Sequence, residues 1–169
     1  MAGMPGMDHG SAPATATRTD FNDADVSFLT MMYPHHAQAV DMAKMVPTRS
    51  QNQQLITLAA NVDKAQAPEM AQFAALLKDF GKPAPRATMD HPMDGVMTQD
   101  QMTQLQNAIG ADFDRLWLQM MIEHHQGAVD MANAEIAKGT NPDAKALAQN
   151  IITAQQAEIQ QMRGMLGQS

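Results

Sequence analysis

The sequence contains no cysteine and few aromatic residues. The absence of cysteine excludes a disulfide framework, a zinc site built from thiolates and a nucleophilic thiol. Phe, Trp and Tyr together make up 4% of the residues, so Ala, Leu, Ile, Val and Met must fill the core. Runs of aromatic and β-branched residues, which are typical of strands, are missing, and a composition rich in Ala, Gln and Met favours helices. These absences predict an all-α protein.

Other absences restrict the partners and the activity. The net charge is -7, and no stripe of Lys and Arg is present to bind a nucleic-acid backbone. No apolar run approaches the roughly 20 residues of a membrane helix, so we expect no membrane span. No basic segment followed by an apolar one marks an export signal in this sequence. Hydrolase and nucleotide-binding motifs such as G-x-S-x-G, H-E-x-x-H and a Gly-rich phosphate loop are also missing, and we predict that the protein is not an enzyme.

Methionine is in excess. The chain has 17 methionines, which outnumber its leucines. Core packing alone does not require this, because Leu is the better-defined filler and Met the more flexible one. The excess therefore indicates a chemical role for the thioethers.

An internal repeat organises the chain. The segments 31–43 (MMYPHHAQAVDMA) and 120–132 (MMIEHHQGAVDMA) are identical at 9 of 13 positions and lie 89 residues apart. The same offset, without a gap, aligns residues 58–77 with residues 147–166, including Gln66 with Gln155 and Glu69 with Glu158. Each copy therefore contains two consecutive elements.

Each copy is predicted to form a helical hairpin. In the first, we expect a helix from Asn22 or Asp23 to about Val46, stopped by Pro47, and a second from about residue 51 to 80, closed by Gly81. In the second, we expect a short helix from Thr98 to near residue 110, a long one over about 112–138, and a last one that starts at Asn141-Pro142 and ends near residue 166. Two such hairpins would bury their apolar faces against each other as a four-helix bundle.

The domain organisation follows from these elements. Residues 1–19 read as a flexible arm that contains Met and His, and residues 20–169 as a single bundle domain. The repeats within this domain cover about 20–81 and 98–167. The Pro-rich linker 82–97 joins them.

Helical spacing places histidines and methionines on shared faces. In each copy, a His-His pair is flanked by methionines one turn before it and two turns after it. Glu158 shares a face with two further methionines of the last helix, whereas Phe73 and Leu76 replace these thioethers beside Glu69. The predicted metal ligands are His35, His36, Met31, Met32, Met42, His124, His125, Met120, Met121, Met131, Met162 and Met165.

The chemistry of these side chains indicates the metal. Thioethers are soft donors and imidazole is intermediate, so a site that mixes them suits Cu(I) and Ag(I), and Cu(II) or Zn(II) less well. The alternative is a packed core with hydrogen-bonded histidines. We favour metal binding, because burying four imidazoles merely for packing would require a hydrogen-bond partner for each ring.

Four acidic residues are expected to act next to the ligands. Asp41 and Asp130 follow the histidines by five or six residues, off their face, and are predicted to orient a ring N–H across the bundle. A solvated surface position is the alternative for both aspartates. We assign Glu69 and Glu158 to the same supporting role.

Two clusters outside the predicted bundle helices share the triplet Met-Asp-His, one in the arm and one in the linker. A thioether and an imidazole two residues apart in flexible backbone can surround a soft ion without a prebuilt cage. These clusters are predicted as auxiliary metal sites, with the residues Met4, Met7, His9, Met89, His91, Met93 and Met97.

The paired HHxxAVDMA segments, the stretch GADFDRLWLQMMIEHHQGAVDMA and the final LAQNIITAQQAEIQQMRGML resemble the domain of unknown function 305 family, over about residues 20–166. This family includes exported copper-binding proteins of the CopM type. The resemblance implies a ferritin-like four-helix bundle, a periplasmic or cell-surface location and Cu(I)/Ag(I) binding in metal tolerance. By motif, it assigns ligand roles to His35, His36, Met42, His124, His125 and Met131.

Rival functions have less support. A di-iron oxidase needs Glu-x-x-His on two helices, but Gln126 stands three residues after Glu123, and Pro34 takes the place of Glu123 in the first copy. A cuprous oxidase is conceivable, since nothing in the sequence distinguishes storage from turnover. A Met-rich module that binds partner proteins rather than metal is the remaining alternative. We predict buffering or delivery of copper, with exchange to a partner protein as a further hypothesis.

Overall fold

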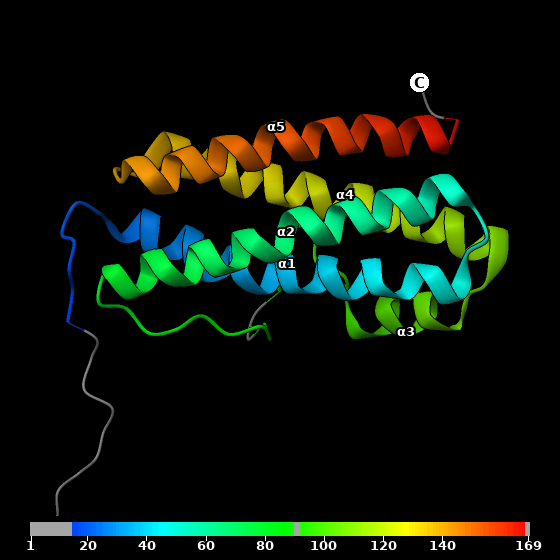
Figure 1. Cartoon of the computed structure of the whole chain (residues 1–169), viewed down its shortest axis with the longest axis horizontal. Helices are drawn as coiled ribbons and strands as arrows, with labels where there is room; N and C mark the ends of the chain where they lie inside the picture. Colours follow the sequence, from blue (N-terminus) through cyan, green and yellow to red (C-terminus); the bar gives the residue numbers. More distant parts are fainter. Residues whose placement is uncertain (1–14, 90–91, 168–169) are drawn as a thin grey trace, which may run out of the picture.

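The computed structural model describes residues 15–89 and 92–167, and within these ranges the chain contains five helices and no strand. The all-α class predicted from composition is confirmed. The helices are α1 (Asp23–Arg49), α2 (Gln53–Asp79), α3 (Gln99–Asn107), α4 (Gly110–Lys138) and α5 (Pro142–Met165). Figure 1 shows the four long helices lying side by side, with α3 outside them beneath α1.

The two copies of the repeat form the two hairpins of the bundle. Helix α1 packs along α2, and α4 packs along α5. The two hairpins meet mainly through α1 and α4, which are the helices that carry the His-His motifs. The repeated motifs are therefore brought to the centre of the molecule.

The helix ends follow the predicted caps with two differences. Asn22 and Asp25 form a capping box at α1, Thr98 and Gln101 form another at α3, and Asn141 caps α5. Helix α1 continues through Pro47 to Arg49, so the predicted stop at Pro47 is wrong. A proline in the last turn removes only one N–H bond, which the helix tolerates at its end. Helix α4 begins at Gly110 rather than at residue 112, without a side-chain cap.

The core is aliphatic and methionine-rich around a few aromatic rings. Trp117 is fully buried and donates its indole N–H to the carbonyl oxygen of Met42 at 2.9 Å, which ties α4 to α1. Phe28 packs edge-on against Phe73, at 6.0 Å between ring centroids. The largest fully buried side chains are Trp117, Phe73, Phe80, Phe113, Leu29, Met32, Met42, Leu55, Leu58, Leu77, Leu105 and Met121.

The described part of the chain has no helix long and apolar enough to cross a membrane. The first described residues lie against the end of the bundle. There the backbone N–H groups of Thr17 and Arg18 donate to the carbonyl oxygen of Asp79 at the end of α2. Arg18 also pairs with Asp20 and with Asp143 at the start of α5. These contacts bind the segment before α1 to the ends of α2 and α5.

Candidate metal centre

Four histidines lie in the middle of the bundle, where α1 and α4 cross. Their exposed fractions are 0% for His35, His36 and His125 and 1% for His124. The ring of His35 lies against that of His124, with 3.9 Å between centroids and a tilt of 47°. The structure thus brings the first histidine of one copy against the first histidine of the other.

The second histidine of each copy faces a glutamate of the neighbouring helix. Nε2 of His36 lies 2.7 Å from the Glu69 carboxylate, a hydrogen bond in which the ring N–H donates. Nε2 of His125 lies 3.5 Å from the Glu158 carboxylate and makes no hydrogen bond with it. The two copies therefore differ: the His36 imidazole is hydrogen-bonded to its carboxylate and the His125 imidazole is not.

Most of the ring nitrogens have no hydrogen-bond partner. Buried polar atoms are normally satisfied, because an unpaired one costs about 1 to 3 kcal/mol. On His124 and His125 both nitrogens are buried without a partner, and on His35 and His36 the Nδ1 atom is. Six of the eight nitrogens on these four rings are therefore buried without a partner, an unusual concentration of unsatisfied polar atoms.

Three of the four histidines are held in the neutral form. Burial lowers the pKa of His35 to about 3, with a smaller contribution from repulsion by His36. Burial also lowers the pKa of His36, although its bond to Glu69 opposes this, and it lowers the pKa of His124 well below the usual value. A neutral imidazole keeps a free lone pair, which is the form that binds metals.

The linker closes over the crossing of α1 and α4. Gly127 of α4 allows the linker to touch the helix, since a Cβ at this position would lie 2.1 Å from the carbonyl oxygen of Asp94. The repeat-equivalent residue in α1, Gln38, bonds both backbone groups of Met97, at 2.8 and 3.0 Å. Held at these two points, the linker places the Asp94 carbonyl 3.3 Å from Nε2 of His35.

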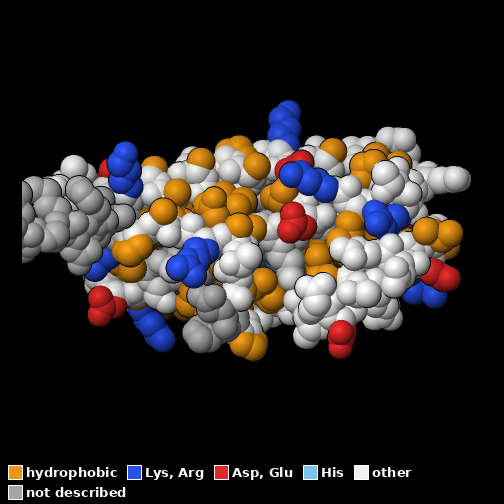
Figure 2. Space-filling view, turned by 90° about the horizontal axis from the view of Figure 1, so that it is seen from below, with side chains coloured by type: hydrophobic (Ala, Val, Ile, Leu, Met, Phe, Trp, Pro, Cys, Tyr) orange, Lys and Arg blue, Asp and Glu red, His pale blue; other side chains and the backbone are white. Residues whose placement is uncertain are grey.

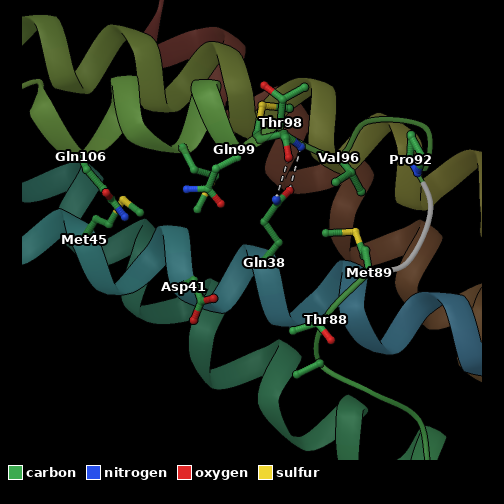
Figure 3. A pocket seen from close by; sticks show the side chains of 13 residues that line it. Gln38, Asp41, Met45, Thr88, Met89, Pro92, Val96, Thr98, Gln99 and Gln106 are labelled. Atoms are coloured by element: carbon green, nitrogen blue, oxygen red, sulfur yellow. Dashed lines mark hydrogen bonds between the residues drawn. The ribbon is translucent and has the colours of Figure 1, made fainter.

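The linker also borders an open groove of about 780 Å³ with α1 and α3 (Figure 3). Figure 3 shows the Gln38 amide reaching the backbone of the linker, with Asp41 and the thioethers of Met45 and Met89 beside it. The histidines do not line this groove. On the face seen in Figure 2, which carries the linker, no described histidine side chain reaches the surface.

The predicted methionine ligands are distributed between the core and the surface. Met31 is 40% exposed, and Met131 and Met165 are half-buried. Met89 and Met93 of the linker are half-buried as well, whereas Met97 is buried. The predicted residues Met4, Met7, His9 and His91 lie outside the described residues. The remaining predicted methionines are buried in the core: Met32, Met42, Met120, Met121 and Met162.

The predicted contact of Asp41 and Asp130 with the imidazoles is wrong, because both side chains are exposed. Asp130 accepts a hydrogen bond from Gln126 on its own helix at 3.2 Å, and Asp41 lines the groove beside the linker. Five or six residues after a buried histidine, a helical side chain has turned to the outer face. The supporting position beside an imidazole is occupied instead by Glu69, which contacts His36. In the second copy, Glu158 lies near His125.

Three groups of this centre were not predicted. Gln66 and Gln155 are each 3% exposed and have amide atoms without partners, one turn before Glu69 and Glu158. Their equivalence in the repeat and their spacing from the glutamates were the available signal. The third group, the carbonyl of Asp94, gave no signal, since its position depends on the path of the linker.

No ready-made cage for a metal ion is present among residues 15–89 and 92–167: nowhere do three or more His, Asp or Glu side chains surround one point. Among the described residues one pair of histidine rings, His35 and His124, lies in close contact, and the rings of His124 and His125 are 6.5 Å apart. Zn(II), which prefers four ligands in a tetrahedron, would need rearrangement of these side chains.

Comparisons with known proteins place this arrangement in a family. The family model "Domain of unknown function (DUF305)" matches residues 25–166, which contain both hairpins and both His-His motifs. The chain belongs to the DUF305 family. The family predicted from the repeated motifs is therefore confirmed. No curated protein matches the chain.

Solved DUF305 structures share the fold. A DUF305 fragment from Deinococcus radiodurans is 31% identical, with a TM-score of 0.81 over 88% of this chain and 99% of that one. A DUF305 protein from Streptomyces coelicolor, provisionally described as secreted, is 29% identical, with a TM-score of 0.78 over 85% and 92% of the two chains. CopM in its Cu(I)-bound form is 33% identical, with a TM-score of 0.71 over 83% and 94%. CopM has also been solved with Cu(II) and with Ag.

Proposed function

We propose that this DUF305 protein binds Cu(I) and Ag(I) as cargo, outside the cytoplasm, and buffers or delivers them. The observation that carries the proposal is the set of six unpaired nitrogens on four buried imidazoles. As packing groups these rings reduce stability, so a role that uses their lone pairs explains why the core contains them. The likeness to CopM, whose structures hold copper and silver, supports the same class of ion.

The centre of the proposed site is the contact between His35 and His124. Each copy supplies one imidazole, and both rings lie where the hairpins meet. His36 and His125 are further candidates: Glu69 accepts the Nε2–H of His36, which orients the ring and leaves its Nδ1 without a partner. We expect the ion to be held by nitrogen donors of both copies, so that binding links the two hairpins.

The test is an anaerobic titration of the purified protein with Cu(I) against a competing chelator. The variant with His35, His36, His124 and His125 replaced by Leu is expected to lose tight binding while it retains its helical circular dichroism. Glu123→Ala is the matched control, since Glu123 is exposed on α4 directly before His124. Equal affinity of the wild type and the quadruple variant would refute a site at the histidines.

The rival functions give different results in the same experiments. A module that binds proteins rather than metal would bind neither Cu(I) nor Ag(I) tightly in either form. A cuprous oxidase would consume oxygen during oxidation of added Cu(I), and we expect no consumption above the buffer rate. A parallel titration with Cu(II) measures whether the protein binds this oxidation state as well. CopM has also been solved in a Cu(II)-bound form.

A further inference from the structure

Met31 differs from the other methionines of the histidine-bearing helices. It is 40% exposed, whereas its repeat equivalent, Met120, is 6% exposed. In the second copy Leu116, which packs against the core, stands where the first copy has Ser27. The exposure of Met31 is therefore a property of one copy only, and core packing does not account for it.

Two cavities adjoin Met31. One, of about 260 Å³, lies between α1 and α4 and is also lined by Met131. The other, of about 360 Å³, lies between α1 and the linker and is also lined by Met89 and Met93. Met31 lines both, so the tertiary structure brings four thioethers from α1, α4 and the linker to two adjoining cavities.

The cavities offer sulfur and little else as a donor. Their walls are apolar, with Phe28 on one side and Pro34 on the other. Glu135 also lines the smaller cavity, but its carboxyl oxygens are fully buried. Ser27 donates its hydroxyl to the Met31 sulfur at 3.3 Å, which restrains this thioether. The larger cavity adds only the hydroxyls of Thr30 and Thr88, and neither cavity offers a hard cation an exposed carboxylate.

Basic side chains at the rim of the cavities add to the preference for soft ions over hard cations. Lys138 borders the smaller cavity, and Lys82 and Arg86 border the larger one. Their charges repel any cation that interacts only electrostatically. Bonding by sulfur to Cu(I) or Ag(I) does not depend on such attraction, because thioethers are neutral soft donors.

We propose that Met31, Met89, Met93 and Met131 form a surface site that captures Cu(I) or Ag(I), separate from the histidine centre. Met31 precedes His35 by four residues, one turn along the same face of α1. An ion held at the surface is therefore one helical turn from the proposed core site. This inference rests on the proposed function in one respect, the choice of Cu(I) or Ag(I) as the ion.

The test uses protein labelled with ¹³C in the methionine methyl groups and titrated with Ag(I), which is diamagnetic. In the NMR spectra, the methyl signals of the four methionines are expected to shift before those of buried Met32 and Met121. The variant Met31→Leu/Met131→Leu should abolish this early shift. Met70→Leu on α2 is the matched control and should leave it unchanged. Leu is close to Met in volume, so both variants are expected to fold.

Repeating the titration in the His-to-Leu quadruple variant separates the two proposals. Early shifts of the four signals that persist in this variant support a surface site of its own. Shifts that disappear with the histidines would overturn the inference and leave the proposed function intact. Shifts confined to the surface cluster in the wild type would support the inference and count against a core site.

Discussion

A buried pair of carboxyl groups joins three helix ends, and its protonation is predicted to control stability. Asp25 of α1 is fully buried and accepts hydrogen bonds from the backbone N–H groups of Thr140 and Asn141, at 3.1 to 3.2 Å, just before α5. Glu135, near the end of α4, is 2% exposed and lies against it. Gly139 makes room for both, since a Cβ there would lie 2.1 Å from a Glu135 carboxyl oxygen and 2.5 Å from one of Asp25.

The two carboxyl groups share one proton. Burial, together with a smaller contribution from the adjacent Asp25, raises the pKa of Glu135 from 4.5 to about 8. Burial acts against the Asp25 carboxylate too, but its hydrogen bonds from Glu135 and from backbone N–H groups outweigh this and lower its pKa. At neutral pH the Glu135 hydroxyl therefore donates to an ionised Asp25.

The sign of the pH dependence follows from these shifts. Above pH 4.5 the unfolded chain releases the Glu135 proton, whereas the native protein keeps it until the pH reaches about 8. The native state therefore becomes less stable between these values. With ~1.4 kcal/mol for each pKa unit, the loss from this group amounts to roughly 3 to 5 kcal/mol.

Glu135→Gln keeps a donor for Asp25 and removes the titration. At about pH 5 the variant and the wild type should have similar free energies of unfolding, and at about pH 8 the variant should be more stable by about 2 kcal/mol or more. Urea denaturation followed by circular dichroism across this range measures the difference. The control is Glu123→Gln, an exposed glutamate of the same helix. Parallel pH profiles for Glu135→Gln and the wild type would refute a shared proton.

Three further predictions concern the crossing of α1 and α4. Gly127→Ala places a methyl group against the Asp94 carbonyl; we expect a loss of about 1 to 3 kcal/mol in thermal denaturation, and an unchanged Tm would show that the linker is not held there. His124→Leu removes two unpaired nitrogens; the metal-free Tm should rise while stabilisation by Ag(I) disappears, and a lower metal-free Tm would contradict this. Trp117→Phe loses the bond to Met42 and leaves a cavity; we expect about 2 to 4 kcal/mol less stability in urea, and a loss below about 1 kcal/mol would refute the packing argument.

Local chemistry made the helices predictable from sequence. The capping boxes at Asn22 and Thr98 and the Asn141-Pro142 start act over three or four residues, so the signal and the structure lie in the same segment. The error at Pro47 has the same local origin: a proline removes one backbone N–H bond without necessarily ending the helix, and two more residues, Thr48 and Arg49, continue α1.

The repeat also predicted the histidines of the candidate site, because two copies of one hairpin bury the same face. It did not separate the acidic groups that approach the rings, Glu69 and Glu158, from the two that do not. Asp41 and Asp130 lie near the histidines in the sequence but face solvent. Glu69 contacts His36 from another helix, which a pattern along one helix does not contain.

The amino-acid sequence by itself determined the helices, the two hairpins, the family and the four histidines, since these depend on short-range spacing and on a duplicated pattern. Only the tertiary structure decided that His35 meets His124, that the linker crosses at Gly127, and that Met31 and Met131 share a cavity. Each of these contacts joins residues about 30 to 100 positions apart. The distances between these residues depend on how the two hairpins pack against each other. This packing depends on the shapes of both surfaces together.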